Sequence, residues 1–301
     1  MEFDGSLRPM PSPSPSAEHE LRRARPVLGT TVEIRAVAKL PAADIHRAID
    51  AAFGTIERIQ RLMSFQDPHS ELSRLNQRRS GRDQHVEPET YTVLEAALEF
   101  ARLSCGAFDP CVGAQLAQRG YRPRHAAADT ASGSWRDIEL AGPGRVRLHR
   151  PVCLDLSGIA KGYAVDCACE VLQAMGTDRI MVNAGGDLRV AGHWSQEVRL
   201  RHPKAPHCGV HVLNLRNRAL ATSAGYYSRR VGAGGTELSA LIDPNRKAPY
   251  LGEDSVSVQA RDCMSADALT KIVLFAAPQL AERALAVCDA RAFIQSAAAA
   301  A

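Results

Sequence analysis

The stretch Asp155-Leu-Ser-Gly-Ile-Ala-Lys-Gly-Tyr-Ala-Val-Asp166 joins an apolar run, a glycine, a lysine-glycine step and the start of a helix. A second apolar run, residues 179–182, leads into Asn183-Ala-Gly-Gly-Asp187. Glycines at strand ends let backbone N–H groups approach a ligand closely. Together with Lys161 and the nearby aspartates, these segments indicate a site for an extended, phosphorylated ligand of nucleotide type.

Composition limits the partners that the chain is expected to have. The 301 residues are 45% hydrophobic, which is enough for one large domain or two smaller ones. Aromatic residues make up 5% and the net charge of +4 is dispersed, so we expect no nucleic-acid binding. The sequence has no apolar stretch long enough to span a membrane and no secretory signal, so we expect no membrane insertion and a cytoplasmic location.

Apolar spacing predicts the secondary structure. Helical periodicity favours helices over 44–63, 90–103, 161–175, 266–275 and 279–287. Since helices and strands come in blocks rather than in strict alternation, the predicted class is α+β, with mixed sheets packed against helices. The strands are expected at residues 31–37, 179–182, 188–191, 198–201, 210–215, 219–222 and 255–260, with a hairpin over 145–156 and a surface loop over 119–137.

The sequence divides into three parts. Residues 1–20, with a Pro-Ser-Pro-Ser-Pro run, are expected to be a disordered tail. Residues 21–296 form the predicted domain, with room for two α/β subdomains, and residues 297–301 are an alanine tail.

Several segments, in order, resemble the flavin transferase (ApbE-like) family, which attaches FMN to proteins. No single match is specific, but their shared order over most of the chain indicates homology. The segments are Leu28-Gly-Thr30, Met63-Ser64 leading to Ser70–Asn76, Gly106–Pro110, Asp155–Asp166, Asn183–Asp187, Ala221–Ser223, Ile242-Asp-Pro244 and Ala266–Thr270.

The resemblance implies a flavin-transferase fold and a reaction. FAD is the substrate, its pyrophosphate is cleaved, FMN goes to a threonine or serine of an acceptor protein, AMP is released, and Mg²⁺ supports the step. Asp267 would bind the metal, with the carbonyl of Ala160 and Thr270 as further ligands. Met63 and Ser64 would close over the flavin.

Other residues are assigned from their chemistry. Gly185 and Gly186 can present N–H groups to a pyrophosphate, and Lys161 can reach a phosphate. We also place Asp109, Asp166, Asp187 and Ser223 in the FAD site, with Asp166 accepting from adenosine hydroxyls. Each residue alone has a plainer interpretation, such as a hairpin turn, a solvated first-turn lysine, a helix-surface carboxylate or, for Met63, a core side chain.

This sequence departs from the family pattern near the residues that are expected to bind the metal. Lys271 stands where the family usually has a metal-binding threonine, and an ammonium group cannot bind magnesium. Either Lys271 supplies the positive charge in place of the metal, and is then catalytic together with Asp267, or it faces solvent while Thr270 serves the metal. Two alternatives to FMN transfer also stay open, namely flavin binding without catalysis and hydrolysis of FAD to FMN and AMP.

Overall fold

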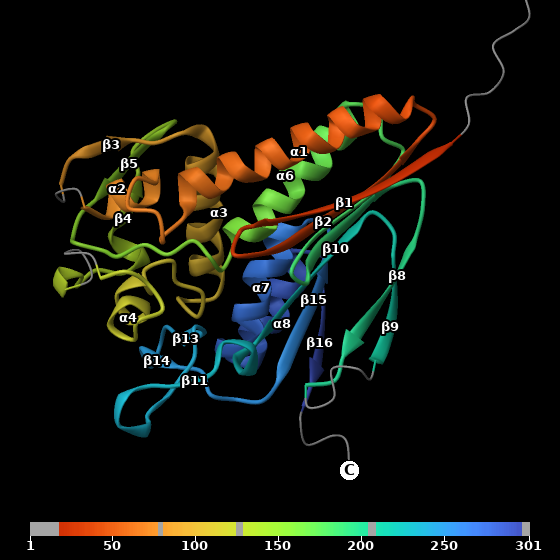
Figure 1. Ribbon diagram of the computed structural model, residues 1–301. Helices are drawn as coiled ribbons and strands as arrows, with labels where there is room; N and C mark the ends of the chain where they lie inside the picture. Colours follow the sequence, from red (N-terminus) through yellow and green to blue (C-terminus); the bar gives the residue numbers. More distant parts are fainter. Residues whose placement is uncertain (1–17, 78–80, 125–128, 204–208, 297–301) are drawn as a thin grey trace, which may run out of the picture.

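The computed structural model describes residues 18–77, 81–124, 129–203 and 209–296, and its centre is a seven-stranded sheet. The strand order is β1-β2-β6-β7-β10-β15-β16, and every neighbouring pair is antiparallel (Figure 1). Along β2, Val32, Ile34 and Ala36 are fully buried, because alternate strand residues point to the same face. The strands are β1 (His19–Val27), β2 (Thr30–Ala38), β6 (Arg179–Ala184), β7 (Asp187–Gly192), β10 (Arg218–Ala224), β15 (Ser255–Ala260) and β16 (Arg291–Gln295).

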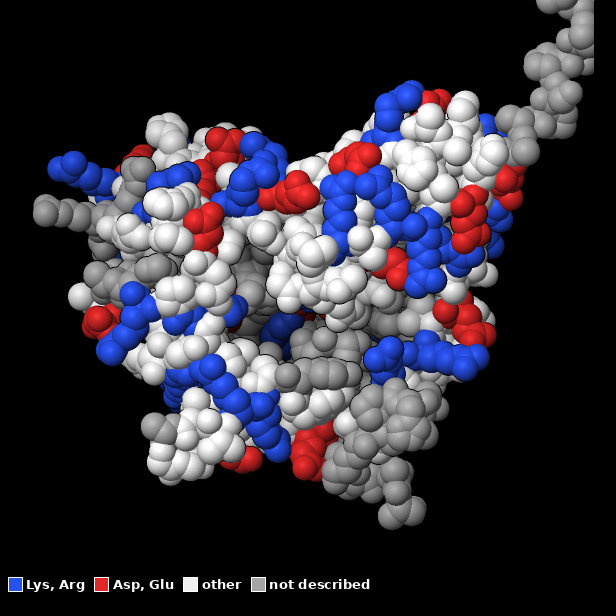
Figure 2. All heavy atoms as spheres, viewed as in Figure 1, with Lys and Arg blue, Asp and Glu red and all other residues white. Residues whose placement is uncertain are grey.

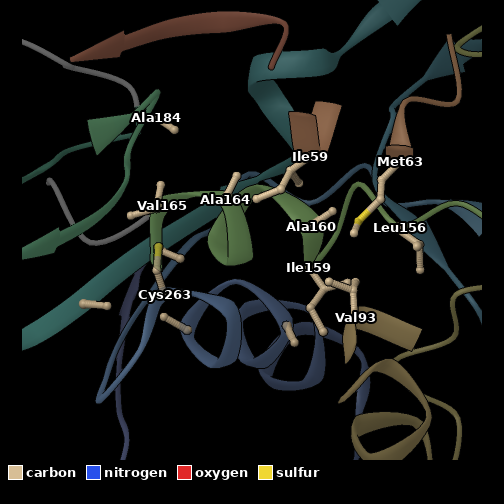
Figure 3. Packing of buried hydrophobic residues seen from close by; sticks show 14 of the residues in the cluster. Ile59, Met63, Val93, Leu156, Ile159, Ala160, Ala164, Val165, Ala184 and Cys263 are labelled. Atoms are coloured by element: carbon tan, nitrogen blue, oxygen red, sulfur yellow. The ribbon is translucent and has the colours of Figure 1, made fainter. Parts of the chain in front are cut away.

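Helices cover one face of this sheet. Helix α6 packs on β6 and β7 and α7 packs on β10 and β15, while α1 lies along α6 (Figure 1). Figure 3 shows side chains of α1, α3, α6 and α7, among them Met63, Val93, Ala164 and Cys263, meeting in the core. The bounds of these helices are α1 (Ala42–Met63), α3 (Pro88–Leu103), α6 (Ala160–Ala174) and α7 (Cys263–Phe275). Helix α8 (Pro278–Val287) packs beside α7.

Smaller elements extend from the sheet and its helices. A three-stranded sheet of order β3-β5-β4 lies with α2 and α4 at the left of Figure 1, and three hairpins complete the described chain. Their bounds are α2 (Glu71–Gln77), β3 (Asp83–His85), α4 (Gly113–Gln118), β4 (Ile138–Leu140), β5 (Arg145–Leu148), β8 (Gln196–Arg201), β9 (Gly209–Leu215), β11 (Arg230–Val231), β12 (Glu237–Leu238), β13 (Ile242–Asp243) and β14 (Ala248–Pro249), with short 3₁₀ helices at Trp135–Asp137, Gly225–Ser228 and Ala233–Gly235.

The α+β prediction is confirmed, and the expected long helices correspond to α1, α3, α6, α7 and α8. The predicted hairpin over 145–156 is wrong. Strand β5 pairs with β3 and β4, and residues 149–156 form no strand. Their backbone finds other partners: the N–H of Leu154 donates to Asn76 Oδ1 at 2.7 Å, and that of Asp155 donates to the carbonyl of Pro110 at 2.7 Å.

The chain ends differ in part from the expectation. Strand β1 begins at His19, inside the segment expected to be a disordered tail, because it pairs with β2 from His19↔Ala38 onward. Residues 1–17 and the alanine tail lie outside the described residues. Within the described ranges, none of the helices has both the length and the apolar character that crossing a membrane requires.

Candidate active site

A cavity of about 1220 Å³ lies between the central sheet and the part of the chain that carries α4. The face drawn in Figure 2 is hollowed near its centre, with basic side chains inside the hollow. The predicted site residues on its wall are Asp109, Lys161, Gly185, Gly186, Ser223, Asp267 and Lys271. The structure thus brings together residues that are far apart in the sequence.

The glycine pair forms the turn between β6 and β7. Gly185 has φ +65° and Gly186 has φ +106°, backbone conformations that favour glycine. A Cβ on Gly185 would lie 2.4 Å from Thr30 Oγ1, whereas one on Gly186 would meet nothing within 4 Å. The N–H of Gly186 donates to Asn183 Oδ1 at 2.9 Å. Gly185 and Gly186 therefore form the turn of the β6–β7 hairpin and also part of the cavity wall.

Lys161 and Asp187 form an ion pair at the first turn of α6. Asp187 is buried, and its Oδ1 also accepts a hydrogen bond from the N–H of Thr222 at 3.3 Å. Burial lowers the pKa of Lys161, the Asp267 carboxylate opposes that effect, and the ammonium group of Lys271 adds to it. Lys161 is thus not a solvated first-turn lysine but a paired charge on the cavity wall.

Asp267 and Lys271 form a second ion pair on α7. The ammonium group of Lys271 contacts Asp267 Oδ1 and donates to the backbone carbonyl of Asp267 at 3.0 Å. The other carboxylate oxygen, Oδ2, accepts from the N–H of Gly162 at 3.4 Å. Burial acts to raise the pKa of Asp267, but the ammonium groups of Lys271 and Lys161 outweigh it, so this pKa lies below its ordinary value.

Residues 28–294 match the model of the ApbE family. The chain belongs to the ApbE family. Among curated relatives, the FAD:protein FMN transferase of Treponema pallidum is 28% identical over an alignment of length 287, which covers 83% of this chain and 77% of that protein. The FAD:protein FMN transferase of Vibrio cholerae is 29% identical over an alignment of length 283, which covers 88% of this chain and 83% of that protein.

Solved structures agree with this assignment to the ApbE family. The ApbE protein of Thermotoga maritima is 27% identical with a TM-score of 0.77, over 92% of this chain and 94% of that one. The flavin transferase ApbE of Vibrio cholerae shares the fold, with a TM-score of 0.76 at 24% identity over 92% of this chain and 94% of that one. The predicted flavin-transferase fold is confirmed.

Asp166 lies elsewhere in this ApbE-family chain. It is not among the cavity-lining residues, and its carboxylate accepts from Arg189 at 2.9 Å and from the N–H groups of Cys263 at 2.9 Å and Met264 at 2.8 Å. These bonds hold the first turn of α7 against α6. Burial outweighs the effect of these partners and raises the pKa of Asp166 to about 6. Its predicted contact with adenosine hydroxyls stays a prediction, and in this arrangement the carboxylate binds protein groups.

Three further predicted residues are placed by the structure around the end of α1 and the start of α4. Met63 is a buried core side chain, and Ser64 Oγ accepts from the N–H of Asp67 at 3.3 Å. Neither lines the cavity, so their contact with flavin stays a prediction. Asp109 does line it, Oδ1 accepts from the N–H of Cys111 at 2.8 Å, and burial raises the pKa of Asp109.

An arginine that was not predicted as a site residue supports the cavity wall. Arg122 comes from the expected surface loop, yet its Nε lies 2.6 Å from Asp155 Oδ2 and its Nη2 donates to Ser157 Oγ at 2.9 Å. Asp155 and Ser157 both line the cavity. The buried Asp155 directly after an apolar run was the available signal, because such a carboxylate requires a cationic partner.

The donors around Asp267 do not fit a divalent cation as they are arranged. Thr270 is fully buried, and its hydroxyl donates to the carbonyl of Asp267 at 2.7 Å and pairs with Ser223 Oγ at 2.7 Å. Ala160 and Thr270 do not line the cavity, and the described chain holds no cluster of three or more His, Cys, Asp or Glu able to bind a metal. Magnesium at Ala160, Asp267 and Thr270 therefore stays a prediction of the resemblance.

Proposed function

We propose that this chain transfers FMN from FAD to a serine or threonine hydroxyl of an acceptor protein and releases AMP. Family membership supports the proposal, since relatives over most of the chain carry the name FAD:protein FMN transferase. The observation that carries it is the pair of cavity-lining lysines, Lys161 and Lys271, each held by a buried aspartate. Two fixed ammonium groups suit a ligand with two adjacent phosphates.

The cavity has the dimensions for this substrate. Its volume of about 1220 Å³ exceeds the range of about 300–1,000 Å³ that is usual for drug-sized ligands. The glycine turn at 185–186 and Lys161 form one part of the wall, while Asp109 and Phe108 lie on another. We place the pyrophosphate beside the turn and the lysines, and the isoalloxazine beside Phe108.

FMN transfer requires no oxidant or reductant. The acceptor hydroxyl oxygen forms a bond to the phosphorus on the riboflavin side, and the bond from that phosphorus to the bridging oxygen breaks. AMP leaves with the bridging oxygen and gains one negative charge, while the hydroxyl proton passes to solvent. Phosphoryl transfer needs positioning and neutralisation of charge more than covalent help from the protein. The lysines provide that neutralisation.

Two measurements on one reaction mixture test the proposal. The purified chain is incubated with FAD and a candidate acceptor protein, and AMP is measured by chromatography while covalent flavin is measured by fluorescence in a denaturing gel. We expect AMP and a fluorescent acceptor in equal amounts. AMP without a fluorescent acceptor would instead indicate an FAD pyrophosphatase, and bound FAD without AMP would indicate a flavin-binding protein.

A matched pair of variants links the result to the cavity. Lys161→Met removes a cavity-lining ammonium group, whereas Lys247→Met makes the same change at an exposed residue outside the cavity wall. Loss of transfer in the first variant and normal transfer in the second supports the proposed site. Equal activity in both would remove Lys161 from the reaction.

A further inference from the structure

Lys271 lies where it can act as a fixed cation rather than as a surface lysine. Its side chain is 15% exposed, and its ammonium group is held by both Oδ1 and the backbone carbonyl of Asp267. Its aliphatic stem runs close to Gly158, since a Cβ there would lie 3.5 Å from Lys271 Cε. The expectation that Lys271 faces solvent one turn into its helix is therefore wrong.

The ammonium group of Lys271 contacts oxygen atoms of the type that a hard cation binds. Carboxylates, carbonyls and hydroxyls are magnesium ligands, and Asp267 supplies the first two. The hydroxyl of Thr270 is already bonded to the Asp267 carbonyl and to Ser223. A divalent cation would thus have to displace the ammonium group from its carboxylate. A divalent cation would also add two positive charges beside the ammonium groups of Lys161 and Lys271. The carboxylates of Asp187 and Asp267 are already paired with those two lysines.

We propose that the ammonium group of Lys271 takes the place of a divalent cation in this chain, so that FAD is cleaved without bound magnesium. The proposal rests on the proposed FMN transfer. Cleavage places one additional negative charge on the departing AMP, and a positive group must face it. Lys271 supplies one charge from a stem that the ion pair holds in place, and Lys161 supplies a second at the same cavity wall.

The first test measures the binding of a divalent cation directly and does not depend on enzyme activity. The native chain and Lys271→Thr are treated with a chelator, dialysed and titrated with Mn²⁺, whose free form is followed by electron paramagnetic resonance, with and without FAD. We expect no stoichiometric Mn²⁺ binding to the native chain. Lys271→Thr removes the ammonium group and adds a hydroxyl, so we expect this variant to bind one Mn²⁺ per chain. One tightly bound Mn²⁺ in the native chain would overturn the proposal.

The second test follows AMP release from FAD with chelator or with magnesium. The native chain should keep its rate in chelator, and Lys271→Thr should need magnesium. Lys271→Gln, which is one atom shorter and carries no charge, should lose the reaction under both conditions, whereas Lys247→Met should behave as the native chain does. Arrest of the native chain by chelator, with recovery on magnesium addition, would contradict the substitution.

The two tests separate this proposal from the proposed function. If the chain releases no AMP under any condition, the FMN-transfer proposal fails, while the Mn²⁺ titration still decides what occupies the cation position. If Lys271→Thr does not fold, as judged by circular dichroism, the Mn²⁺ and chelator results on the native chain decide alone.

Discussion

A Cβ on Gly162 would lie 2.2 Å from the carbonyl oxygen of Cys263. The first turns of α6 and α7 are therefore in direct backbone contact, and only a residue without a side chain fits between them. This contact lets the N–H of Gly162 reach the carboxylate of Asp267. It also places Lys161 and Lys271, one from each helix, at the same cavity wall.

Gly162→Ala should destabilise the fold. The added methyl group meets backbone rather than a movable side chain, so we expect a loss of about 1–3 kcal/mol in the free energy of unfolding, measured with urea. Gly54→Ala is the control, because Gly54 is an exposed position inside α1 where a Cβ meets nothing within 4 Å. That variant should gain about 0.5–1 kcal/mol. Equal effects would contradict the close helix contact.

FAD should bind more tightly than FMN, because in the proposed position of the ligand the pyrophosphate lies beside Lys161 and the glycine turn. Calorimetry with both ligands measures the difference. Lys161→Met should weaken FAD binding about tenfold or more, the usual effect of losing a hydrogen bond to a charged group, and should affect FMN less. Equal affinity of the native chain for FAD and FMN would contradict the proposed position of the ligand.

The Asp166 carboxyl should make stability depend on pH. Burial raises its pKa from 3.8 to about 6, so the folded chain holds this proton more tightly than the unfolded chain does. Stability should therefore fall as pH rises from about 4 through 6, by up to about 3 kcal/mol from this group, and then level off. Urea unfolding across this range measures the slope, and Asp166→Asn should flatten it. The same slope in both proteins would show that another group titrates.

Asp267→Asn should abolish transfer and also cost stability. The structure shows a buried ion pair with Lys271, for which removal of one partner costs about 3–5 kcal/mol. We expect transfer to fall at least about 100-fold at a temperature where circular dichroism still shows a folded chain. Asp50→Asn, in an exposed pair with Arg25, should change neither property.

The long helices and the buried strands could be predicted from the sequence because their apolar periodicity is strong. Strand β1 could not, since its residues are mostly polar or charged and its place depends on pairing with β2. Strand β16, at the far edge of the sheet, is similarly defined by its pairing with β15.

The candidate site was predictable where local motifs carried it. The glycine turn and Lys161 were predicted from local motifs and Asp267 from the family resemblance, and all of them line the cavity. The orientation of Lys271 could not be predicted, because it depends on Asp267 one turn earlier in the helix and on Gly158 from another segment. The hydrogen bonds of Asp166 to Arg189 and Cys263 could not be predicted, because these partners are distant in the sequence.

FMN transfer by this chain should leave covalent flavin on proteins of the source cell. Cells that lack this chain are compared with cells that express the native chain or Asp267→Asn, and their proteins are digested and analysed by mass spectrometry. We predict peptides with FMN esterified to serine or threonine in cells with the native chain, and their absence in cells with none or with the variant. The same flavin-modified peptides in all three cell lines would contradict the account.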